Sequence, residues 1–378
     1  MESLYEKISQ FMPRKWKYQP LVNHERKDIE KESASRYNSC LISICLAAVL
    51  SMGIIISWGV SLTRVPTSCT HLVRRMEWRE LNKTQKQDYI SAVVCLTEKE
   101  SHFEPGSSRY DDFAYMHVFE GTVTHYAASF LPWHRYFIHI YEKALIEECG
   151  FHGSLPYWDW ALDAHDLAAS PIFDPIDGFG GNGTSRSSLP AIFGGHCVTE
   201  GPFANATRHW QSKSNGHGFD ILKNPHCLSR GFQGGEKKTE LENRVTIDAI
   251  NSVLSLQSYE EFVDALEVQA HNSIPQFVRG DFYGLTAPND PVFYLHHAQV
   301  DRLWWLWQQQ DTESRTKTYQ GPRQNTRVHA NESLSGSSLD DVVSLGNLSE
   351  PVRVHEITGS VIVDYDYVLT DRRLNPYV

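Results

Sequence analysis

The sequence predicts a mainly α-helical globular domain with long loops, preceded by one membrane-spanning helix. Two distant stretches, 125–135 and 290–307, combine residues typical of helix starts with apolar and aromatic side chains at helical spacing. A third stretch, 41–60, contains no charged residue. The chain therefore divides into a polar tail (1–40), an anchor (41–60) and one domain (61–378).

Composition supports a single large globular domain. Roughly 310 residues follow the uncharged stretch, which is ample for one core. The chain is 41% hydrophobic and 12% aromatic, and its formal net charge is −11. An acidic chain gives no indication of nucleic-acid binding, so we expect no nucleic-acid partner.

The uncharged stretch 41–60 has the length of a membrane span. As a helix it would be about 30 Å long, which matches the hydrocarbon core of a bilayer. A cleaved signal peptide is the alternative, but about forty mostly polar residues precede the stretch and no small-residue cleavage motif follows it. Basic residues are balanced on the two sides and do not decide the orientation.

Five glycosylation sequons decide the orientation instead. All follow the span, at Asn82, Asn182, Asn205, Asn331 and Asn347. Because N-glycans are added on the lumenal side, we expect a cytosolic N-terminus and a lumenal or extracellular domain.

Such a compartment permits disulfides. We expect Cys69 to pair with Cys95 and Cys197 with Cys227, which leaves Cys149 unpaired.

Three histidines gather at one predicted helix junction. His117 ends a short helical pattern, His125 follows in a connection, and His134 lies just after Pro132, which suits the first turn of a helix. With no run of cysteine or carboxylate ligands nearby, three imidazoles predict a site for copper, zinc or iron.

The second stretch carries two adjacent histidines on one predicted helix. Asn289 or Asp290 can cap this helix. His296 and His297 project about 100° apart on it, so only one readily faces a given metal. We favour His297 and interpret His296 as a hydrogen-bonded core residue. Asp301, one turn below His297, could orient that imidazole, or bind Arg302 or a backbone group.

These two stretches resemble the tyrosinase family of type-3 copper proteins, which includes catechol oxidases and molluscan haemocyanins. The matching motifs are His125-x4-Phe130-Leu-Pro-Trp-His134-Arg135 and Asp290-Pro-x-Phe293-x3-His297-x3-Asp301-Arg302. The similarity extends from about Cys69 to at least Trp307, and is strongest to short tyrosinase-like oxidases of filamentous fungi.

The resemblance implies a four-helix bundle around two copper ions. His117, His125 and His134 would bind the first copper, and His271 and His297 the second. It also implies dioxygen-dependent oxidation of phenols, catechols or tyrosyl side chains, in the tailoring of a secondary metabolite.

One position departs from the family pattern. The second copper usually takes two histidines one helical turn apart, but Pro275 occupies the position one turn after His271. Proline lacks a backbone N–H, so we expect the helix to end or kink there. Gln276 is a poor copper ligand, and His296 could approach only if its helix were rotated or distorted. A mononuclear or asymmetric copper oxidase for crosslinking, or a catalytically silent copper-binding accessory protein, therefore stay open.

By the same resemblance, Glu267 and Asn272 would orient a water that removes a phenolic proton. Glu267 precedes His271 by one helical turn, although a solvated helix carboxylate is the alternative. Further on, 352–357 and 361–368 flank a Thr-Gly-Ser turn and predict a small C-terminal β-hairpin.

Overall fold

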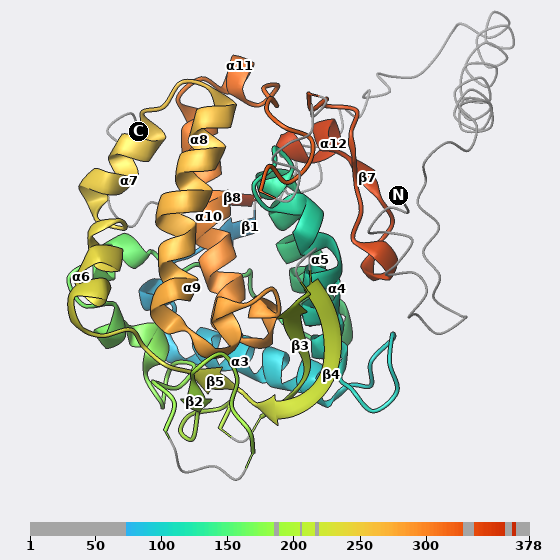
Figure 1. The fold of residues 1–378 in the computed structure, drawn as a ribbon, viewed down its shortest axis with the longest axis vertical. Helices are drawn as coiled ribbons and strands as arrows, with labels where there is room; N and C mark the ends of the chain where they lie inside the picture. Colours follow the sequence, from blue (N-terminus) through green and yellow to red (C-terminus); the bar gives the residue numbers. More distant parts are fainter. Residues whose placement is uncertain are drawn as a thin grey trace, which may run out of the picture. The chain divides into compact units, whose positions relative to one another are not determined.

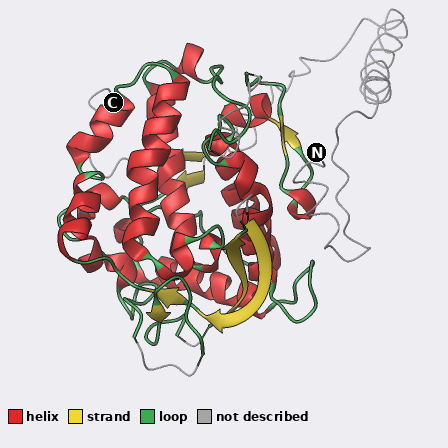
Figure 2. Cartoon of the chain, in the orientation of Figure 1, coloured by secondary structure: helices red, strands yellow, loops and turns green. Residues whose placement is uncertain are grey.

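The computed structural model describes residues 73–184, 189–204, 206–215, 219–327, 336–359 and 365–367. This part of the chain is mainly helical, with a few short strands (Figures 1 and 2). None of its helices combines the length and apolar character that a membrane span requires. The expected anchor (41–60) lies outside the described residues.

Four helical segments form the central bundle, in agreement with the predicted helical class. They are α4 (Arg109–Thr124), α5 (Phe130–Cys149), α10 (Val292–Gln309) and a composite helix. The composite helix joins α8 (Tyr259–Ala265), the π-helical turn η5 (Leu266–His271) and α9 (Asn272–Val278). In Figure 1, α8, α9 and α10 stand together, and α4 and α5 lie beside them.

Local sequence signals set the ends of these helices. Ser108 and Asp111 form a reciprocal capping box at the start of α4. Gly150 ends α5 in a left-handed conformation that favours glycine. Between these ends, α5 and α10 bury almost all of their apolar side chains, so each is covered by protein on several sides.

We expected the composite helix to end or kink at Pro275, but it continues through this residue to Val278. Pro275 lies inside α9, so the helix lacks the hydrogen bond that a backbone N–H at this position would make. The irregularity comes earlier, in the wider π turn η5, which ends at His271. A π turn shifts the hydrogen-bond ladder by one residue, and this shift lets the helix accommodate the proline.

The remaining elements surround the bundle. The further helices are α3 (Lys83–Glu98), α6 (Gly235–Asn243), α7 (Ile247–Leu254), α11 (Thr312–Arg315) and α12 (Val354–Thr358). Short 3-10 turns are η1 (Trp78–Glu80), η2 (Trp160–Asp163), η3 (Leu167–Ala169), η4 (Pro171–Phe173), η6 (Gly280–Tyr283), η7 (Ala287–Asn289) and η8 (Gly346–Leu348). The largest sheet is an antiparallel pair, β3 (Thr207–Ser214) and β4 (Phe219–Cys227), which packs against α4.

Three small two-stranded sheets complete the described fold. β2 (His196–Cys197) pairs with β5 (Ser229–Arg230), and β6 (Val342–Val343) with β7 (Val352–Arg353). β1 (Val73–Arg75) pairs in parallel with β8 (Tyr365–Tyr367).

The predicted C-terminal hairpin was wrong. Most of its first half forms the helix α12, because Val354 and Ile357 are both buried at helical spacing. Its second half contributes β8, whose partner is β1 at the other end of the domain.

The disulfide pattern differs from the expectation at one pair. Cys197 bonds to Cys227, as expected, but Cys95 bonds to Cys149 rather than to Cys69. Cys95 lies near the end of α3 and Cys149 at the end of α5, and these helices pack together with the two Cα atoms 5.9 Å apart. Cys69 lies outside the described residues.

Candidate metal centre

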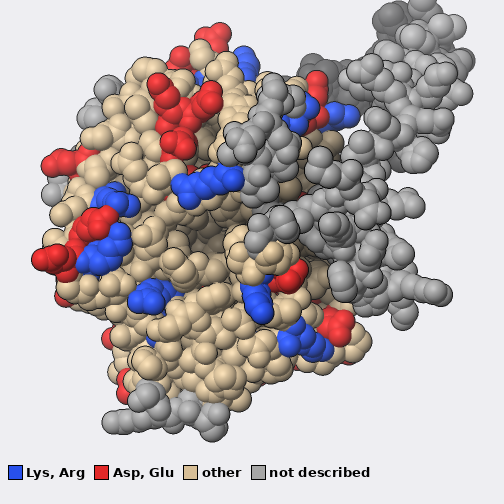
Figure 3. All heavy atoms as spheres, viewed as in Figure 1, with Lys and Arg blue, Asp and Glu red and all other residues tan. Residues whose placement is uncertain are grey.

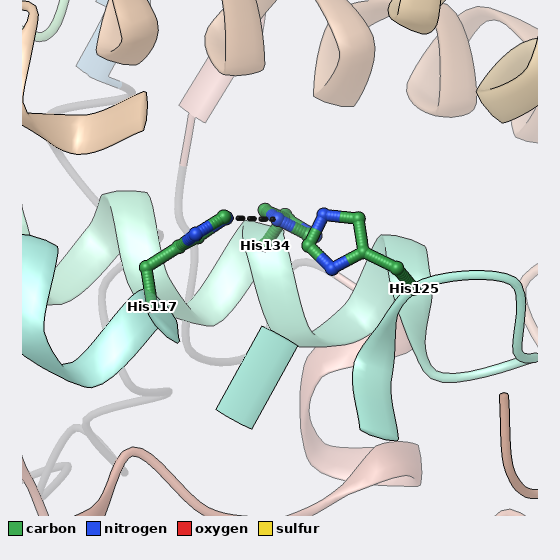
Figure 4. A group of neighbouring side chains, drawn as sticks. All are labelled: His117, His125 and His134. Carbon is green, nitrogen blue, oxygen red and sulfur yellow. Dashed lines mark hydrogen bonds between the residues drawn. The ribbon is translucent and has the colours of Figure 1, made fainter. Parts of the chain in front are cut away.

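His117, His125 and His134 come together as the sequence predicted. His117 lies within α4, His125 caps its C-terminal end, and His134 lies in the first turns of α5. One ring nitrogen from each lies within 4.8 Å of the others. Figure 4 shows the three rings converging, with Nε2 of His117 3.3 Å from Nε2 of His134.

Backbone carbonyl groups orient all three rings. The Nδ1 atoms of His117, His134 and His125 lie 2.7, 2.7 and 2.9 Å from the carbonyl oxygens of Leu285, Phe130 and Gly121. A carbonyl only accepts, so each Nδ1 donates its hydrogen. Each Nε2 then keeps a free lone pair, which is the arrangement that a metal-binding imidazole needs.

Burial keeps these imidazoles neutral. It lowers the pKa of His125 to about 4, and it lowers the pKa of His117 and of His134 well below the usual range, with neighbouring histidines adding to the effect. A neutral ring binds a metal ion without first losing a proton.

A second triad comprises His271, His296 and His297. His271 ends the π turn η5, and its Nε2 lies 3.3 Å from Nε2 of His297 on α10. Nδ1 of His271 lies 3.0 Å from the Asn272 amide oxygen, which holds that ring as the carbonyl groups hold the first three.

His296 is the member of the second triad that the sequence interpretation missed. It is 1% exposed, yet neither ring nitrogen has a hydrogen-bond partner in the described part of the chain. Such a buried group is costly unless something else satisfies it, and a metal ion would. The predicted core hydrogen bond was therefore wrong, and the rings of the adjacent residues His296 and His297 lie with their centroids 5.0 Å apart.

The two triads face a common space. The rings of His134 and His297 stack with centroids 4.2 Å apart, so the two triads are in direct contact. A cavity of about 770 Å³ reaches five of the six histidines, namely His117, His125, His271, His296 and His297.

Glu267 is buried and is not a solvated carboxylate, and its hydrogen-bond partner Tyr126 lines the cavity. It is 1% exposed, and both its oxygens accept from the backbone N–H of Tyr126 at 2.9 Å. Burial raises its pKa to about 8. The Asn272 amide donates to the Tyr126 hydroxyl at 3.3 Å, so Tyr126 lies between the two expected proton-handling residues.

Asp301 pairs with two arginines from outside its own helix. It forms ion pairs with Arg135 of α5 and with Arg75 of β1. Arg302, which the sequence offered as a partner, pairs with Asp159. The Arg135–Asp301 pair thus links α5 and α10, two of the helices that carry the clustered histidines.

Three of the sequon asparagines, Asn82, Asn182 and Asn347, are exposed. Asn205 and Asn331 lie outside the described residues.

Residues 107–310 match the family model of the common central domain of tyrosinase. The chain belongs to the tyrosinase family. It is 45% identical over 330 residues to the tyrosinase-like protein phomQ1 of Diaporthe leptostromiformis, covering 86% of this chain and 85% of that one. It is 38% identical over 356 residues to tyrosinase ustQ of Aspergillus flavus, covering 91% and 94%.

A solved structure has a similar fold. The polyphenol oxidase of Thermothelomyces thermophila, solved as a point mutant, superposes with a TM-score of 0.67 at 28% identity, covering 79% of this chain and 89% of that one. Copper is the family's cofactor, and the two triads could bind two ions.

Proposed function

We propose that this tyrosinase-family protein is a dicopper oxidase that oxidises phenols or catechols with dioxygen and tailors a secondary metabolite. The observation that carries the proposal is the pair of histidine triads on one cavity. His117, His125 and His134 would hold one copper, and His271, His296 and His297 the other. Copper, when bound, supplies the electron transfer that dioxygen chemistry needs.

The protein's own residues would orient the substrate and move its proton. The phenol enters the cavity toward the histidines, where Phe293 packs against the His297 ring at 4.2 Å between centroids. Glu267 and Asn272 would hold a water that takes the phenolic proton, and the Glu267 carboxylate would accept it. A pKa of about 8 leaves Glu267 basic enough for this transfer near neutral pH.

Copper analysis of the purified domain tests the proposal. We expect two coppers per chain and oxygen consumption with methylcatechol. His134→Ala should remove at least one copper and abolish turnover, because a two-histidine site has lost a bond and gained an open position. A variant that retained its full copper content and its turnover would refute the assignment.

The same measurement separates the alternatives that Pro275 left open. One copper with turnover would indicate a mononuclear or asymmetric oxidase, and one copper without turnover an accessory protein. The convergence of His296 on the second triad supports two coppers instead.

We also propose that the domain is lumenal or extracellular and anchored by 41–60. The uncharged stretch and the sequons that follow it support this topology.

A further inference from the structure

The cavity that reaches the histidines has a basic lining. Its charged lining residues among those that the structure describes are Lys213, Arg244 and Arg327, with no aspartate or glutamate in that described set. In the whole chain the balance is reversed, with 46 acidic and 35 basic residues. Figure 3 shows basic groups around the hollow in this face of the molecule.

We propose that this cavity selects phenols that carry a carboxylate, bound by Arg327 and Lys213 while the ring faces the histidines. The inference rests on the proposed oxidase function and adds the substrate class to it. Carboxylates pair with guanidinium and ammonium groups through charge-assisted hydrogen bonds, the strongest polar contacts available to an exposed substrate group.

Arg327 is connected to the expected chemistry through Tyr126. Its guanidinium lies 3.6 Å from the centroid of the Tyr126 ring, and Tyr126 in turn contacts Asn272 beside His271. The Arg327 side chain is exposed and can turn toward a ligand. Two side chains, Tyr126 and Asn272, thus connect a carboxylate held at Arg327 to His271 of the second triad.

Lys213 supplies the second positive charge, from the end of β3. It is exposed, and its cross-strand neighbour Asp220 accepts a hydrogen bond from Asn215. Arg244 contributes less, because it is already paired with Glu240. Arg327 and Lys213 therefore carry the argument.

The size of the cavity fits a substrate larger than a simple phenol. At about 770 Å³ it lies well within the range of sites for drug-sized ligands. A ring at the histidines leaves room for a body that extends to the rim. Since the molecule as a whole carries a net charge of −11, local cations are needed to attract an anion to this cavity.

Steady-state kinetics with dihydrocaffeate and its methyl ester tests the proposal. The two compounds share the catechol ring and differ in one negative charge. We expect the acid to exceed the ester in kcat/KM by about tenfold at low ionic strength, and the ratio to fall as salt screens the charges. Lys213→Gln and Arg327→Gln should each lower this ratio by about fivefold.

Lys223→Gln is the matched control. Lys223 lies on the neighbouring strand β4, pairs with Glu104 and is not among the lining residues of the described cavity, so this change should leave both rates unaltered. An acid-to-ester ratio near one in the unmutated protein, or an unchanged ratio in Lys213→Gln and Arg327→Gln, would overturn the proposal.

Binding to the copper-free protein separates this inference from the oxidase proposal. Calorimetry should detect dihydrocaffeate binding that weakens in Lys213→Gln, whether or not the protein turns over. Charge-selective binding without oxidation of methylcatechol would refute the oxidase and keep the anion site. Oxidation of methylcatechol without charge selectivity would refute the anion site and keep the oxidase.

Discussion

At the residue scale, we propose that His296 supplies the ligand that is missing at Pro275. The position one turn after His271 carries no ligand atom, while a buried imidazole without a hydrogen-bond partner in the described chain lies in the second triad. We predict that His296→Ala lowers the copper content from two to one per chain, because two histidines alone hold the second ion weakly. Metal analysis after dialysis against a mild chelator measures this.

Pro275→His provides the rescue arm of the same experiment. Pro275 lines the cavity, so an imidazole at this position can reach the second site. Combined with His296→Ala, it should return the second copper. If His296→Ala alone keeps both coppers through dialysis, His296 is only a core residue.

The pKa of Glu267 predicts how the rate of phenol oxidation depends on pH. Its pKa of about 8 lies above the ordinary value for a carboxyl group, so the basic form grows as pH rises through 8. Phenol oxidation should therefore increase between about pH 7 and 9. Glu267→Gln should lower that rate by about 100-fold and remove the rise. Catechol oxidation, followed in parallel, is the control, and an unchanged pH profile in the variant would exclude Glu267 as the base.

The sequence predicted five of the six clustered histidines and missed His296. Helix spacing correctly places residues one turn apart on the same face. His117, His125 and His134 lie at a helix junction that local sequence signals predict. Spacing sets where each side chain leaves the helix but not where its ring lies, and the rings of His296 and His297 both belong to the second triad. The burial of Glu267 was equally hidden, since it depends on Tyr126, 141 positions away in the sequence.

At the element scale, the composite helix is a case in which local sequence rules did not predict the structure. Proline rules predicted that the helix would end or kink at Pro275, but the helix continues through Pro275 to Val278, after a π turn that ends at His271. The pairing of β1 with β8 was also beyond local rules, because it joins the two ends of the domain. Helices with strong caps and apolar faces, such as α5 and α10, were predictable because their signals are local.

The Cys95–Cys149 disulfide gives the prediction at this scale. It ties α3 to the end of α5 across a sequence separation of 54 residues. Replacing both cysteines with serine should lower the free energy of unfolding by about 3 kcal/mol, through the freedom that the unfolded chain regains. Denaturant unfolding of the oxidised protein measures the change. Cys69→Ser is the control and should have no effect, whereas a loss of similar size there would favour the Cys69–Cys95 pair.

At the scale of the whole molecule, charge is distributed unevenly. The chain is acidic overall, yet the cavity that reaches the triads is lined by basic side chains. Composition alone could not reveal this local reversal, because the basic lining residues come from β3, the end of α6 and the loop after α11. The substrate selection that we propose would thus depend on the assembled fold.

The anchor is the remaining prediction at this scale. The stretch 41–60 is uncharged and long enough to cross a bilayer, and every sequon follows it. We predict that the full chain stays with membranes after alkaline extraction, because a spanning helix is held by hydrophobic burial rather than by charge. Treatment with an N-glycan-removing enzyme should lower its apparent mass, since exposed Asn82, Asn182 and Asn347 are accessible for modification. A glycosylated protein released into the soluble fraction would show that 41–60 is cleaved, and an unglycosylated membrane protein would place the domain in the cytosol.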